Sequence, residues 1–344
     1  MALSLNKILE WCEENQKAFW EYMLYDDMQE RSVSKEASMT QMEKSFDVMC
    51  NTTATYRMSR LSASGLVGAE GGKLERYFAA HENENNDSVL VDAGNAACEQ
   101  AKCGLTADSE NVDMHIDTRA EKCGLNVDED LNNSLKSVKV PLSGTFSAAA
   151  MVVALKMAES NACMRRIVAA PTAGACGVIP AVLIPYYEQR HAEKIEIIKA
   201  LYVAAAIGQV ISDKASISGA QGGCQAEIGS ASAMAAGALV YLQGGTNVQI
   251  CHAAALALKG LLGLVCDPVA GLVEVPCVKR NVTGTVNAIA CADMAMAGIE
   301  SRIPPDEVID AMAEVGMKMD VSLRETAQGG LAATPTGKSV SEHR

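Results

Sequence analysis

The feature that most constrains the fold is a series of apolar segments, rich in small residues, that begins after residue 140. Alanine, glycine and methionine supply most of their bulk, and aromatic residues make up only 4% of the chain. Such residues suit closely packed helices, whereas strands favour β-branched and aromatic side chains in alternation. We find no clear alternating segment and expect an all-α fold. The expected core helices are 147–160, 200–210, 230–242, 250–262, 284–299 and 305–319.

Amphipathic helices are also expected before this core. Apolar side chains recur at helical spacing at Leu5, Ile8, Leu9 and Cys12 and again at Phe19, Met23 and Leu24. A further helix is expected after Ser34, which is placed to cap it. Its apolar stripe is Met39, Met42, Phe46 and Met49.

The loop at 60–72 interleaves serine with glycine. Backbone N–H groups in such a loop can hold a carboxylate or a phosphate. A glycine-rich linker has the same composition, so the loop by itself does not assign a function.

Residues 81–137 differ in character from the rest of the chain, because they hold thirteen Asp and Glu residues against four Lys and Arg residues. The motif Lys-Cys-Gly-Leu-x-x-Asp occurs twice, starting at Lys102 and at Lys122. Cys98, Cys103 and Cys123 lie close in sequence, but no zinc-type Cys-x-x-Cys spacing accompanies them. We therefore favour a mobile acidic insertion over a metal-binding tract. The expected organisation is an N-terminal helical region with a loop at 1–80, the insertion at 81–140 and a helical core at 141–344.

The overall charge of −13 and the pI near 4.9 argue against binding to nucleic acid or to an anionic membrane. The first residues have neither the apolar segment of a signal peptide nor the basic character of a transit peptide. With twelve cysteines and no sign of secretion, we expect a cytoplasmic protein whose thiols stay reduced. The longest apolar stretch, 248–265, carries His252 and Lys259 and is expected to be a buried helix and not a membrane span.

Three cysteines stand out between residues 219 and 280: Cys224, Cys266 and Cys277. Each has glycine or proline nearby, which favours a turn over the middle of a helix. Turns can direct three thiols toward a shared centre. Three thiolates without a fourth would bind an iron–sulfur cluster and leave one iron open, so we expect the cluster to act as a Lewis acid.

Five motifs then point to one family. They are Asn161-Ala-x-Met, Arg166-Ile-Val-Ala-Ala-Pro-Thr-Ala-Gly, Gly223-Cys-Gln-Ala-Glu-Ile-Gly, Cys266-Asp-Pro-Val-Ala-Gly-Leu-Val-Glu-Val-Pro-Cys277 and Gly329-Gly-Leu-Ala-Ala-Thr-Pro-Thr-Gly-Lys. Together and in this order they resemble the α chain of the iron–sulfur-dependent L-serine dehydratases. The resemblance extends from Pro141 to Lys338 and, more weakly, over Ser34–Phe78.

The resemblance implies a helical catalytic core in which Cys224, Cys266 and Cys277 ligate a 4Fe–4S cluster. It implies conversion of L-serine to pyruvate and ammonia without pyridoxal phosphate, and a β chain as partner. Association with further copies of this chain is also compatible with it. The chain departs from the family pattern at the acidic insertion. It also departs from it at Cys163 and Arg165, where the family usually has smaller residues.

The resemblance also suggests where substrate binds. We expect the L-serine carboxylate at the loop of Ser62, Ser64 and Gly65 and at the turn of Thr172 and Gly174, which we place at a helix start.

Further side chains are candidates for roles in catalysis. Thr172 is the leading candidate for a catalytic residue; Lys338 is another, although it equally fits a solvated lysine of the tail. Glu227 and Glu274 are expected to orient the site. Two candidates for the general base are left: His252, which could equally be a histidine of the core, and a histidine of the β partner.

Other classes of protein share some of these sequence features, and each requires a further feature of its own. A pyridoxal-phosphate dehydratase would need an alternating strand–helix pattern, which is not found. A related lyase acting on L-cysteine or L-threonine would keep the same cluster chemistry. A non-catalytic iron–sulfur redox or sensor protein normally uses four cysteines, and a structural zinc site would need closer cysteine pairs.

Overall fold

The computed structural model describes residues 3–62, 64–82 and 142–342. Within these ranges the regular structure is helical, apart from one isolated parallel bridge between Cys266 and Arg324. The expected all-α fold is confirmed. The acidic segment 81–140, including its repeated cysteine motif, lies almost entirely outside the described residues. The core and the site described below belong to one compact unit, formed by Met1–Glu75 and Thr145–Arg344.

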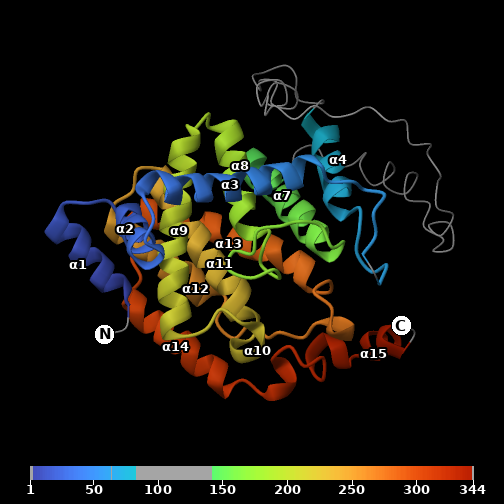
Figure 1. Cartoon of the computed structure of the whole chain (residues 1–344). Coiled ribbons are helices and arrows are strands. Elements are labelled where there is room, and N and C mark those ends of the chain that lie inside the picture. Colours follow the sequence, from blue (N-terminus) through green and yellow to red (C-terminus); the bar gives the residue numbers. More distant parts are fainter. Residues whose placement is uncertain (1–2, 63, 83–141, 343–344) are drawn as a thin grey trace. The chain divides into compact units, whose positions relative to one another are not determined.

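The N-terminal helices are α1 (Leu5–Asn15), α2 (Phe19–Arg31), α3 (Lys35–Ala54) and α4 (Glu70–Glu82). The core helices are α7 (Gly144–Ala162), α8 (Val178–Gln189), α9 (Lys194–Lys214), α11 (Ser230–Leu242), α12 (Asn247–Gly260), α13 (Cys277–Met296) and α14 (Pro305–Lys318). Short helical segments connect or follow them: α10 (Gly219–Gly222), η3 (Gln225–Gly229), η4 (Val269–Gly271), η5 (Val321–Leu323), η6 (Gly330–Ala333) and α15 (Pro335–Glu342). Figure 1 shows their arrangement.

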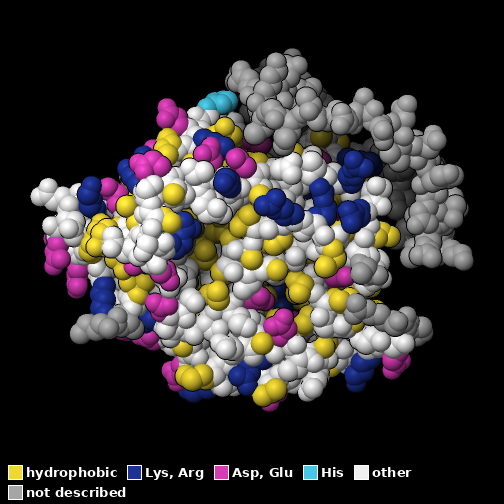
Figure 2. All heavy atoms as spheres, viewed as in Figure 1, with side chains coloured by type: hydrophobic (Ala, Val, Ile, Leu, Met, Phe, Trp, Pro, Cys, Tyr) yellow, Lys and Arg dark blue, Asp and Glu magenta, His cyan; other side chains and the backbone are white. Residues whose placement is uncertain are grey.

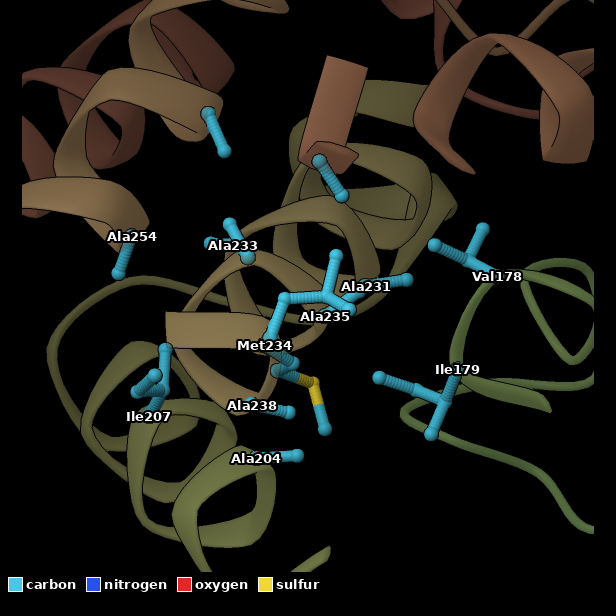
Figure 3. Packing of buried hydrophobic residues seen from close by; sticks show 14 of the residues in the cluster. Val178, Ile179, Ala204, Ile207, Ala231, Ala233, Met234, Ala235, Ala238 and Ala254 are labelled. Atoms are coloured by element: carbon cyan, nitrogen blue, oxygen red, sulfur yellow. The ribbon is translucent and has the colours of Figure 1, made fainter. Parts of the chain in front are cut away.

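Helix α11 lies at the centre of the core, and every residue from Ser230 to Val240 is buried. It packs against α8, α9, α12 and α13. Small side chains let these helices approach closely: a methyl group added at Gly237 would lie only 2.3 Å from the Ile207 side chain of α9. Figure 3 shows the alanines of α11 among apolar side chains of α8, α9 and α12. The bounds expected for this helix, 230–242, match the structure.

Helix α9 is long and apolar enough, by length and composition, to cross a membrane. In this structure 67% of its apolar window is buried inside the protein. Its neighbours are α2, α3, α8, α11 and α14. The helix therefore behaves as a central element of a packed core, for which apolar residues on all sides are expected.

The N-terminal helices follow the predicted pattern. The Ser34 hydroxyl accepts a hydrogen bond from the Ala37 N–H at 3.2 Å and caps α3, while Phe46 and Met49 are buried. Helix α1 is capped by Ser4, whose hydroxyl accepts a hydrogen bond from the Lys7 N–H at 3.2 Å. A second acceptor comes from a distant part of the chain: the Asp306 carboxylate accepts hydrogen bonds from the N–H groups of Leu5 and Asn6, each at 3.0 Å. Asp306 lies in the first turn of α14, so this carboxylate joins α1 to α14.

Some boundaries differ from expectation. Helix α13 begins at Cys277, seven residues before the expected start, because polar residues of its first turns find partners inside the fold. The loop expected at 60–72 ends where α4 begins at Glu70, and the expected C-terminal loop is partly helical, with η6 and α15. Helix α8, which contains Pro185, had no predicted bounds.

The Asp306 cap can be tested against its neighbour Asp310, because both carboxylates also contact Lys214. Asp306→Ala is expected to lower the free energy of unfolding by about 2–3 kcal/mol, since two backbone N–H groups lose a charged acceptor. Asp310→Ala removes only an exposed ion pair and should cost less than about 1 kcal/mol. Denaturant unfolding measures both; equal effects would contradict the capping role.

Candidate functional site

The three cysteines come from three separate segments and are all buried. Cys224 lies between α10 and η3, Cys266 lies in the extended segment paired with Arg324, and Cys277 is the first residue of α13. Their exposed fractions are 2%, 2% and 6%. As predicted, none lies in the middle of a helix.

The three thiols are close enough to influence one another electrostatically. Burial raises the pKa of Cys224 to about 11 and that of Cys277 to about 12. Burial also raises the pKa of Cys266, and the charges of Cys224 and Cys277 raise it further. The charges of the three thiols act on one another, so they lie in one region of the structure, and burial favours the protonated thiol over the thiolate.

The turn that carries Cys224 is held by close backbone packing. Gly223 has a φ of +74°, and a methyl group there would lie 2.5 Å from the Met319 sulfur. The Gln225 N–H donates to the Leu264 carbonyl at 2.9 Å, and the Gln225 side chain donates to the Met312 carbonyl of α14 at 3.1 Å. These contacts fix Cys224 against the segment that leads to Cys266.

Arg280 joins the segments of Cys224 and Cys266. Its guanidinium donates to the Val265 carbonyl at 2.7 Å and to the Asp267 carboxylate at 2.8 Å. It also forms a hydrogen bond with the Cys224 sulfur, and its charge acts to lower the pKa of that thiol against the effect of burial. A single cation on α13 thus holds both cysteine segments, and its charge favours the thiolate forms of Cys224 and Cys277.

Asp267 also connects the site to the C-terminal region. Its second oxygen accepts a hydrogen bond from the Leu331 N–H at 2.7 Å. Gly330 has a φ of +57°, and a methyl group there would lie 2.4 Å from the same carboxylate. Gly330, the first residue of η6, is therefore needed for the C-terminal segment to approach the residue next to Cys266.

Two glutamates link the predicted hydroxyl-bearing loops to the cysteine segments. Glu274, which is 4% exposed, accepts hydrogen bonds from Ser62 at 2.7 Å and from Ser64. Glu227 accepts one from Thr172 at 2.7 Å. The hydroxyl groups that we expected to receive a substrate carboxylate are thus engaged by carboxylates of the protein in this structure.

Glu227 lies close to the cysteines as well. A methyl group added at Gly219 would lie 2.9 Å from the Glu227 carboxylate and 3.0 Å from the Cys266 sulfur. Burial raises the pKa of Glu227, while the Thr172 hydrogen bond favours its ionised form. The absence of a side chain at Gly219 leaves the carboxylate and the thiol adjacent to one another.

Asn281 fixes the turn that carries Thr172. Its side chain is fully buried; it accepts a hydrogen bond from the Gly177 N–H at 2.8 Å and donates to the Gly174 and Cys277 carbonyls at 2.8 and 3.0 Å. The turn does not sit at a helix start as expected, because α8 begins only at Val178. The physical reason is that Asn281 holds residues 174–177 in a non-helical turn.

The remaining predicted residues lie in different environments. Gly65 has a φ of +75°, which suits the tight turn after Ser62. Lys338 is exposed on α15. His252 accepts a hydrogen bond from the Ser301 N–H at 3.2 Å through Nδ1, an arrangement that suits a structural histidine.

Thiolates are the donors that iron–sulfur clusters use, and the three buried thiols with a cation beside them suit such a cluster. In the part of the chain that the structure describes, no three Cys, His, Asp or Glu side chains are close enough to hold a single metal ion.

Comparison with known proteins decides the family. The model of the serine dehydratase alpha chain family matches residues 8–332, which is most of the chain. The chain belongs to the serine dehydratase alpha chain family.

Individual relatives, some named α chains and some not, are similar to this chain over shorter spans. A probable L-serine dehydratase alpha chain of Bacillus subtilis (strain 168) is 56% identical over 199 residues, which make up 58% of this chain and 66% of the relative. The L-serine dehydratase alpha chain of Peptoniphilus asaccharolyticus is 50% identical over 208 residues, 60% of this chain and 70% of the relative. The L-serine dehydratase TdcG of Escherichia coli (strain K12) is 48% identical over 182 residues, and the match spans 40% of that protein.

Sequence reasoning missed the polar residues that hold the cysteine segments of this family member together. Arg280, Asp267 and Asn281 were given no role, although Asp267 directly follows Cys266 and Arg280 is three residues after Cys277. On a helix, a residue three positions after a ligand lies on the same face. That spacing was the available signal.

Asn281 offers a test of the turn. Asn281→Ala leaves the buried Gly177 N–H without an acceptor and is expected to lower the free energy of unfolding by about 2–3 kcal/mol. Asn161→Ala is the control, because Asn161 makes a single exposed hydrogen bond to the Ala173 carbonyl of the same turn. It should cost about 1 kcal/mol or less. A cost for Asn161→Ala as large as that for Asn281→Ala would contradict this assignment.

Proposed function

We propose that the chain catalyses the dehydration of L-serine to pyruvate and ammonia with a 4Fe–4S cluster held by Cys224, Cys266 and Cys277. The observation that carries the proposal is the gathering of these three buried thiols beside Arg280. Membership of the serine dehydratase alpha chain family supports it. Because the chain spans under two thirds of its Bacillus relative and two fifths of TdcG, the activity of those proteins is carried over here as a proposal.

When bound, the cluster would supply an iron that acts as a Lewis acid on the departing hydroxyl group. Arg280 would offset the negative charge that three thiolates bring into a buried site. Because burial favours the protonated thiols, binding of a cluster through thiolates would release their protons.

The two glutamates are placed to bind and orient the substrate. Glu227 lies next to Cys266 across Gly219 and is oriented by Thr172, so its carboxylate can accept the ammonium group of L-serine. Glu274 holds Ser62 and Ser64, which fixes the loop on the other side of the cysteine segment. Loss of water from L-serine leaves an enamine, which tautomerises and hydrolyses to pyruvate and ammonia.

The proposal extends to partners and location. The α-chain names of the relatives support a β chain as partner, and self-association is compatible with it. The acidic charge and the cysteine content favour a cytoplasmic protein that binds neither nucleic acid nor membrane. L-Threonine and L-cysteine are the alternative substrates to compare.

The cysteine assignment is tested by anaerobic reconstitution with iron and sulfide, with and without a β chain, followed by assays on L-serine, L-threonine and L-cysteine. Cys224→Ala, Cys266→Ala and Cys277→Ala are each expected to reduce activity to background and to lower the iron bound. Cys291→Ala is the control, because Cys291 is a buried cysteine on the same helix as Cys277. Full activity in any of the first three variants would overturn the assignment.

The role of Thr172 is tested by changing only its hydroxyl group. Thr172→Val removes the hydrogen bond that orients Glu227 and is expected to lower kcat/KM by about tenfold or more. Thr172→Ser retains the donor and should remain close to the unmodified chain. Steady-state kinetics on L-serine decide the matter, and an active Thr172→Val variant would remove Thr172 from the site.

A further inference from the structure

The outer side of helices α12 and α13 exposes apolar side chains to solvent. Val248 on α12, Val286 on α13 and Ile299 shortly after α13 have exposed fractions of 51%, 40% and 50%. Ala290, one helical turn after Val286, is exposed as well. Exposed apolar side chains that lie together commonly mark a contact with another molecule.

The two helices form one continuous surface. They lie side by side in opposite directions: the Gln249 side chain donates to the Ala295 carbonyl at 3.0 Å, and the Asn287 side chain donates to the Ala257 carbonyl at 2.9 Å. Both helices pack against the central helix α11. Their exposed residues therefore lie on the side away from the core, which we call the α12–α13 face.

The α12–α13 face is almost without charge. Helix α12 and the part of α13 from Asn281 to its end carry two charged side chains, Lys259 and Asp293. Asp293 is exposed, and Lys259 is partly exposed. Among the described residues neither of them forms an ion pair. One positive and one negative group are thus both available to a partner, and their charges cancel.

The rest of the molecule gives this neutrality its meaning. Figure 2 shows acidic and basic side chains distributed over the face that carries α3. The chain has a net charge of −13, so two copies repel one another as a whole. A contact between copies is least opposed where a face has no net charge.

The area of the face is sufficient for a weak specific interface. Helix α12 has 14 residues and α13 has 20. With a rise of about 1.5 Å per residue and a width of about 10 Å, the two helices present a face of about 20 by 25 Å. Two copies in contact through it would bury about 1,000 Å² in total, which is the area at which specific interfaces begin.

We propose that two copies of the chain associate through the α12–α13 face, related by a twofold axis. In such an interface every contact is made twice, so Lys259 of one copy meets Asp293 of the other and both ion pairs form. A second copy therefore complements the charges of this face without any other partner. Asp293 lies sixteen residues after Cys277, about 24 Å along α13, so the dimer leaves the cysteine segments open to a β chain.

The test is sedimentation velocity of the full chain under anaerobic conditions at about 10–100 µM, where an interface of this size is expected to give a dimer. Lys259→Asp and Asp293→Lys place like charges opposite each other, and each should raise the dimer Kd about tenfold or more. Ala290→Arg, which puts a charge among the apolar side chains, should do the same. Lys44→Asp is the control, because Lys44 is an exposed lysine on α3, and it should leave the dimer unchanged.

A mixture of the Lys259→Asp and Asp293→Lys variants tests the twofold arrangement directly. Each mixed dimer pairs Asp with Lys at both contacts, so the mixture should associate at concentrations at which each variant alone is monomeric. Three results would overturn the proposal: an unmodified chain that stays monomeric at about 100 µM, a dimer that none of the face variants weakens, or a mixture that stays monomeric. Because the readout is association and not turnover, it is independent of the proposed reaction.

Discussion

The contact between Arg280 and Asp267 determines how the rest of the site is arranged. The arginine reaches the carbonyl before Cys266, the carboxylate after it and the sulfur of Cys224, while the same carboxylate holds the backbone of Leu331. A buried ion pair of this kind contributes little net stability but is strongly destabilising when one partner is lost. Its value here is geometric, because it brings segments from separate parts of the sequence to one place.

The packed helices supply the rigid frame that this contact needs. Cys277 and Arg280 lie in the first turn of helix α13. The next residue, Asn281, fixes the non-helical turn that carries Thr172. Helix α13 is in turn packed against α11, whose small side chains allow close contact on several sides. The irregular segments that carry the chemistry are therefore short and held by well-ordered helices, as functional loops commonly are.

Sequence reasoning reached the fold class and the bounds of α11, because apolar composition alone determines a fully buried helix of small residues. It also placed the three cysteines outside helix interiors, since glycine and proline mark turns in the sequence. It missed the start of α13, where Arg280 and Asn281 interrupt the apolar pattern. Both side chains can lie in this helix because the folded chain gives them hydrogen-bond partners. The periodicity of apolar residues in a sequence does not indicate such partners.

Glu227 and Glu274 were singled out from the sequence, because each lies three residues from a cysteine. Their hydrogen bonds to Thr172 and to Ser62 and Ser64 were not predictable, since these hydroxyl groups come from distant segments of the chain.

The cap that Asp306 provides for α1 has a consequence for synthesis. A growing polypeptide presents Leu5 and Asn6 at the ribosome long before Asp306 has been made. Those two amides therefore meet this acceptor only after most of the chain has been made, whereas the Ser4 hydroxyl can hold the Lys7 N–H of the same helix from the start. The full set of N-terminal hydrogen bonds of the first helix thus depends on a residue that the ribosome adds about three hundred positions later.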